Sequence, residues 1–133
     1  MPTQSPPGLF VENRAKAIAA LAQELTRNRY VGRFGTVSTF ELRPMIDRVL
    51  DYYGRWSGGD QRELPACLDF LENICFALSI PLAETAYALY VLRDGITAML
   101  CSGAENENDE NSETIRQVNR FFEGLVRDLL RRY

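Results

Sequence analysis

The residue types that most often carry enzymatic chemistry are scarce in this sequence. The 133 residues include no histidine, the usual general base, metal ligand and haem ligand. The cysteines, Cys67, Cys75 and Cys101, form no Cys-x-x-Cys pair of the kind that binds zinc. The carboxylates of Glu84 and Asp94 belong to one predicted helix, so roughly 15 Å separates them along its axis. We therefore expect no enzymatic activity, no metal and no other cofactor.

The cysteines also bear on localisation. Their number is odd, and Cys67 and Cys75 lie about 12 Å apart along one predicted helix, which is too far for a disulfide. Free thiols are typical of a reducing compartment, so we expect a cytoplasmic protein. The N-terminus, MPTQSPPG, has no apolar core of a signal peptide. No uncharged apolar run is long enough to span a bilayer, so we expect no membrane insertion.

The charge distribution argues against nucleic-acid binding. The net charge is −3, and the basic residues include a single lysine, Lys16. The range 1–59 carries 8 basic and 5 acidic side chains, whereas 60–133 carries 7 and 13. Non-specific binding to nucleic acid needs a dense basic patch, which neither half offers.

A pair of charged residues and a set of aromatic residues each allow a functional interpretation as well as a structural one. Arg93 and Asp94 interrupt an apolar helix, where a charge is costly unless it is paired. They form either a salt-bridged polar rim or an anchor in a ligand pocket or subunit interface. Aromatic residues at helical spacing are usually core, but they also line small-ligand pockets. The predicted candidate pocket consists of Trp56, Tyr87, Tyr90 and Arg93.

The elements that would position these residues are all helical. The range 79–103 is apolar on nearly every side, which predicts a buried central helix at about 81–102. Amphipathic stripes predict further helices at about 9–28, 44–56, 60–78 and 112–132. A turn at 38–42 precedes Pro44, or the helix kinks there. We expect an all-α fold of five or six helices, a globin-like domain or a helical bundle.

The predicted organisation is a flexible leader, residues 1–8, followed by a single helical domain, residues 9–133. The first and last helices carry more apolar surface than one small core needs. Surplus apolar faces on terminal helices often form a two-fold dimer interface, so we expect a homodimer. The predicted interface residues are Phe10, Leu21, Leu25, Phe121, Phe122 and Leu129.

Three runs of the sequence resemble a known family. They are FELRPMIDRVLDYY, LPACLDFLENICFALSI and IPLAETAYALYVLRDGI, within the range 37–100. Together they are similar to the N-terminal domain of stressosome co-antagonists of the RsbR/RsbRD type. The resemblance implies an all-helical, globin-like, haem-free domain that dimerises and serves as an input module for an output domain or a histidine kinase. The sequence ends at Tyr133 without the output domain that the resemblance would imply, so a stand-alone protein and an excised N-terminal domain both stay open.

The expected function is a non-enzymatic sensory or regulatory domain in bacterial signal transduction. It would act through dimerisation and a change in helix packing, passed along the last helix to a protein partner or output domain. The alternative is a helical protein that binds a small apolar or anionic ligand.

Overall fold

Five helices make up the described part of the chain. The structure is a computed structural model that describes residues 13–28, 32, 34, 37, 39–103 and 109–132. Its helices are α1 (Arg14–Arg27), α3 (Thr39–Ser57), α4 (Glu63–Leu78), α5 (Leu82–Gly103) and α6 (Asp109–Arg131). These residues include no strand, so the predicted all-α fold is confirmed. The predicted leader, residues 1–8, lies outside the described residues.

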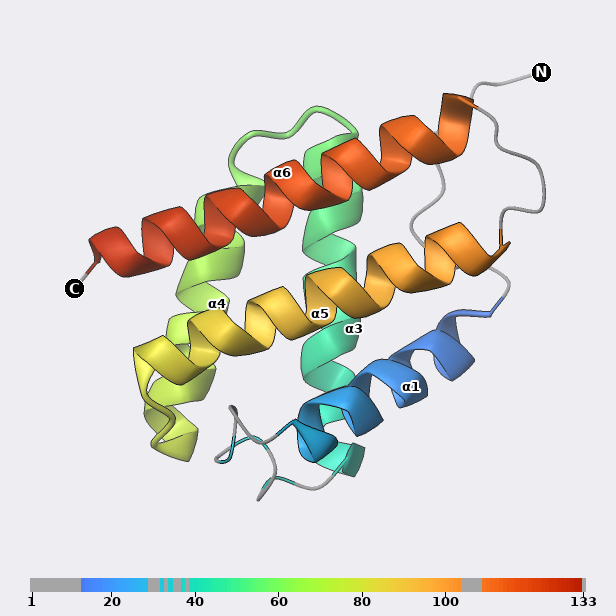
Figure 1. Cartoon of the computed structure of the whole chain (residues 1–133). Helices are drawn as coiled ribbons and strands as arrows, with labels where there is room; N and C mark the ends of the chain where they lie inside the picture. Colours follow the sequence, from blue (N-terminus) through green and yellow to red (C-terminus); the bar gives the residue numbers. More distant parts are fainter. Residues whose placement is uncertain are drawn as a thin grey trace.

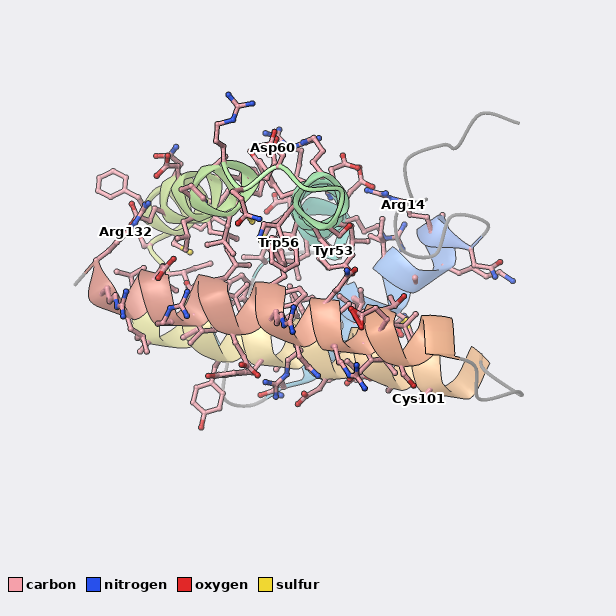
Figure 2. The ribbon with its side chains drawn as sticks, turned by 90° about the horizontal axis from the view of Figure 1, so that it is seen from above. Arg14, Tyr53, Trp56, Asp60, Cys101 and Arg132 are labelled. Atoms are coloured by element: carbon pink, nitrogen blue, oxygen red, sulfur yellow. The ribbon has the colours of Figure 1, made fainter. Side chains whose placement is uncertain are left out.

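The helices are arranged in two layers (Figure 1). α1, α5 and α6 lie side by side in one layer with α5 in the middle, and α3 and α4 cross behind them. Figure 2 shows side chains filling the space between the layers. All five helices contribute fully buried residues to this core: Leu21, Ile46, Leu68, Leu89 and Leu125.

α3 is one continuous helix that contains Pro44. The predicted alternative, a separate turn at 38–42 before the main helix, is therefore wrong. Pro44 is exposed and lies near the helix start, so its missing N–H removes only one backbone hydrogen bond.

The two ends of α4 are fixed in different ways. At its start no side-chain hydrogen bond caps the helix, and the Asp60 carboxylate accepts a hydrogen bond from the Arg62 backbone N–H, at 3.1 Å. At the other end Ser79 adopts a left-handed conformation, with φ of 57°. The Ile80 N–H then donates to the Cys75 carbonyl at 2.8 Å, which closes the helix as in a Schellman motif.

The expectation that the central helix is buried on all sides is only partly correct. α5 is the middle helix of its layer, and Leu89, Leu92 and Ile96 are fully buried. Its outer face is not covered: Tyr87 is 52% exposed and Tyr90 38%. A tyrosine keeps its hydroxyl hydrated at a surface, so a helix with few charges need not be buried all round.

α1 is held against α3 and α5. Its Arg14 side chain donates to the carboxylates of Asp47 and Asp51 in α3, each at 2.8 Å. On the other side α1 approaches α5 closely at Gly95, where an added Cβ would lie 2.6 Å from Leu21 Cδ2. Glycine at this position therefore lets the two helices pack at their observed distance.

Candidate functional site

The residues predicted to form a dimer interface lie inside the single chain. Leu21, Leu25, Phe121, Phe122 and Leu129 all have an exposed fraction of zero. The prediction that they contact a second copy is therefore wrong. Each terminal helix faces several neighbours, so each needs a broad apolar face: α1 packs on α3 and α5, and α6 packs on α3, α4 and α5. Phe10, the remaining predicted interface residue, lies outside the described residues.

Trp56 belongs to the contact between the layers rather than to a pocket with the tyrosines of α5. Its ring centroid lies 5.3 Å from that of Phe121 in α6 and 6.2 Å from that of Tyr53 in α3. Figure 2 shows Tyr53 and Trp56 between α3 and α6. Burial raises the pKa of Tyr53 to about 12, with the Glu113 carboxylate adding to the rise. This aromatic cluster is part of the core.

The other three predicted pocket residues lie on α5. The Arg93 guanidinium is stacked 4.8 Å above the Tyr90 ring and donates to the Asp94 carboxylate at 3.0 Å. The Asp94 side chain is 70% exposed, so the pair forms a polar rim at the surface. Tyr87 lies one turn earlier and is exposed. The structure thus brings Tyr90 and Arg93 together on an outer face, while Trp56 packs elsewhere.

The outer face of α5 carries few charges compared with that of α6 beside it. The exposed residues of α5 between Leu82 and Cys101 include one ionised side chain; they are Ala83, Tyr87, Tyr90, Asp94, Ala98 and Cys101. Those of α6 between Ser112 and Arg131 include six; they are Ser112, Glu113, Arg116, Arg120, Glu123, Arg127, Leu130 and Arg131. We call the six exposed α5 residues the α5 face. Sequence reasoning missed this face because it assigned the helix to the interior.

The α5 face borders a hollow of about 440 Å³ between α1 and α5. Small residues, Ala20, Gly95 and Ala98, form much of its wall, and Glu24 and Asp94 supply its charged edge. Small side chains allow another helix to come close to a surface. The α5 face is therefore a shallow, weakly charged surface with room for a neighbouring side chain.

Two of the cysteines are core residues. Burial raises the pKa of Cys67 to about 12, and burial also raises the pKa of Cys75. The Cys75 thiol lies 2.8 Å from the hydroxyl of Thr85, which in turn donates to the Pro81 carbonyl at 3.2 Å. Neutral buried thiols are poor nucleophiles, so these two cysteines act in packing. Cys101 is exposed on the α5 face.

A second surface feature lies between α3 and α4, and sequence reasoning did not find it. It is a groove of about 330 Å³, and apart from Glu41 and Arg48 its lining is apolar: Val37, Leu42, Pro44, Met45, Phe70, Ile74, Ala77 and Leu78. We call it the α3–α4 groove. The sequence carried one signal for it: Phe70 is a large apolar residue of α4 that lies outside the buried set Cys67, Leu68, Leu71 and Cys75.

Two kinds of feature are absent from the described residues. No group of three or more histidine, cysteine, aspartate or glutamate side chains is placed to hold a metal ion in 13–28, 39–103 or 109–132. None of the five helices is long and apolar enough to cross a membrane.

Comparisons of the chain with protein-family models, with curated proteins and with solved structures found no match.

Proposed function

We propose that this chain is a non-enzymatic regulatory domain that acts as a homodimer, with the α5 face at the centre of the dimer contact. The observation that carries the proposal is the low charge of this face. Exposed helix faces of a monomer are usually rich in Asp, Glu, Lys and Arg, as the α6 face is. The α5 face has instead the composition of an interface centre, which is depleted in charge and enriched in tyrosine.

The arrangement of the layer favours a second copy of the chain as the occupant. α1, α5 and α6 lie side by side, so the α5 face is the middle of a broad surface (Figure 1). A stable interface buries roughly 800 Å² on each partner, about a tenth of the 8155 Å² accessible here. The α5 face alone is too narrow, so exposed charges of α1 and α6, such as Glu24, Arg27 and Arg120, would form a polar rim.

Such a dimer would link an event at its contact to the last helix. α5 and α6 run side by side along their lengths, so a shift of α5 at the dimer contact displaces the surface on which α6 packs (Figure 1). Passage of that shift along α6 to a protein partner or output domain is the mechanism that we propose for bacterial signal transduction. The resemblance to stressosome co-antagonists, carried by the runs in 37–100, agrees with this role.

Size-exclusion chromatography with multi-angle light scattering tests the dimer. We expect the wild-type chain to have twice the monomer mass, and Tyr87→Glu to have the monomer mass, because it places a charge at the centre of the contact. Leu130→Glu is the matched control, since Leu130 is 51% exposed on α6 outside the α5 face. This variant should remain a dimer.

The proposal fails if the wild-type chain is monomeric at high micromolar concentration. It also fails if Leu130→Glu dissociates the dimer while Tyr87→Glu does not, because the contact then lies on α6. Far-ultraviolet circular dichroism of both variants confirms that the comparison is between folded proteins.

A further inference from the structure

The α3–α4 groove lies away from the α5 face. α3 and α4 form the layer behind α5, so the groove and the α5 face belong to different layers (Figure 1). The wall from α4 extends from Phe70 to Leu78, about 12 Å along the helix axis. The wall from α3 extends from Glu41 to Arg48. Two helices thus enclose a strip about two helical turns long.

The groove is shallow. Half of its ten lining residues are themselves exposed: Glu41, Pro44, Arg48, Ala77 and Leu78. Small-molecule sites usually bury most of the surface of their ligand, which an open strip of this kind does not do. Shallow apolar grooves between two helices are instead suited to the apolar side of a third helix, with contacts at positions i, i+3 or i+4, and i+7.

One cation is fixed at the end of the groove. The Arg48 guanidinium lies 4.7 Å from the Phe70 ring centroid, and its Nη2 donates to the Tyr52 hydroxyl at 3.3 Å. None of the described ion pairs involves Arg48. A guanidinium has five N–H donors in a planar arrangement, so most of them are free to meet a carboxylate. The Glu41 carboxylate lies about 10 Å away along α3, at the other end of the groove. The groove is therefore complementary to an apolar surface with an acidic residue at the Arg48 end.

We infer that the α3–α4 groove binds an amphipathic helix of a partner protein, whose apolar residues fill the strip and whose Asp or Glu pairs with Arg48. The inference goes beyond the proposed dimer and uses none of its residues. With the dimer contact on one layer and this groove on the other, a dimer would present two partner sites.

A displayed library of helical peptides of about 18 residues tests the inference, with one row of leucines fixed and each flanking position either glutamate or lysine. Selection on the full chain should enrich peptides with glutamate beside the leucine row. Fluorescence anisotropy then measures one enriched peptide against wild-type protein and variants. We expect Arg48→Glu to weaken binding about tenfold, because an attractive pair becomes a repulsive one.

Variants in the groove and at a control position distinguish binding in the groove from non-specific binding to exposed apolar side chains. Leu78→Asp puts a charge in the groove and should weaken binding at least tenfold, and Ala77→Glu is a second groove variant if Leu78→Asp does not fold. Phe76→Asp is the matched control: Phe76 is 89% exposed but lies on the polar face of α4, with Asp69 and Asn73. It should change the dissociation constant less than twofold.

Three results would overturn the inference. The first is a selection that enriches no peptide or only lysine-flanked ones. The second is equal binding by wild type and the groove variants. The third is saturable binding of decanoate, measured by calorimetry, by a protein that binds no peptide, because the site would then serve a small amphiphile. None of these results bears on the oligomeric state measured by light scattering, so the dimer proposal is tested independently.

Discussion

α1 and α5 approach each other closely at Gly95. We predict that the effect of Gly95→Ala on the free energy of unfolding depends on one neighbouring side chain. In Gly95→Ala the new Cβ would lie 2.6 Å from Leu21 Cδ2, about 1 Å closer than two carbon atoms prefer. Leu21 is fully buried, so its side chain has little room to move. Overpacking of this kind costs about 1–3 kcal/mol. Alanine gains about 1 kcal/mol over glycine within a helix, so we expect a net destabilisation of about 1 kcal/mol.

In a protein that carries Leu21→Val, the predicted effect of Gly95→Ala on stability has the opposite sign. Valine has no Cδ atoms, so the clash disappears while the helix propensity gain of alanine remains. In that background Gly95→Ala should stabilise the protein by about 1 kcal/mol. The two backgrounds thus differ by about 2 kcal/mol, a coupling typical of residues in direct contact.

Urea unfolding followed by far-ultraviolet circular dichroism measures all four proteins of this cycle. The melting temperature should follow, at about 4 °C for each kcal/mol. Each curve is recorded at two protein concentrations, because association of folded chains adds to apparent stability. An effect of Gly95→Ala that is equal in both backgrounds, within about 0.5 kcal/mol, would refute the reasoning.

Two further predictions concern α4 and its core. Ser79→Gly should stabilise the chain by about 1 kcal/mol, because glycine adopts the left-handed conformation of Ser79 without strain; Ser79→Ala should give no such gain in the same urea assay. The pKa of Cys67 is raised by burial to about 12 from an ordinary 9.0, so the unfolded thiol ionises first and stability falls as pH rises between these values. This thiol lowers the free energy of unfolding by at most about 1.4 kcal/mol per pH unit. In urea unfolding at several pH values, Cys67→Ala should remove this pH dependence. Cys101→Ala, at an exposed thiol, should leave it in place.

Local patterns predicted most of the helical fold. The stripes of α1, α3, α4 and α6 are periodic, and the helices predicted at 44–56 and at about 81–102 end within one residue of α3 and α5. The sequence did not reveal how many neighbours each helix has. Leu21 and Phe122 were predicted to lie in a dimer interface because the terminal helices carry more apolar surface than one small core needs. In the two-layer arrangement each terminal helix has several neighbours, which cover these residues completely.

The candidate surfaces were harder to predict because they depend on tertiary geometry. Tyr87 and Tyr90 were predicted to be core or pocket residues of a helix with few charges. They are exposed because no other helix covers the outer face of α5. The α3–α4 groove needs the distance between two helices, which no local pattern contains. Phe76 was also unexpected, since it lies on the polar face of α4 with Asp69 and Asn73.

The position of Trp56 gives the molecule an internal optical reporter. It is the single tryptophan of the chain, and it lies at the end of α3 against Phe121 of α6. The same helix supplies one wall of the α3–α4 groove near its beginning. Indole emission changes in wavelength and intensity with its surroundings, so a tilt of α3 relative to α6 becomes visible without any added label. Stopped-flow mixing with a peptide ligand would then time the movement of one layer against the other directly.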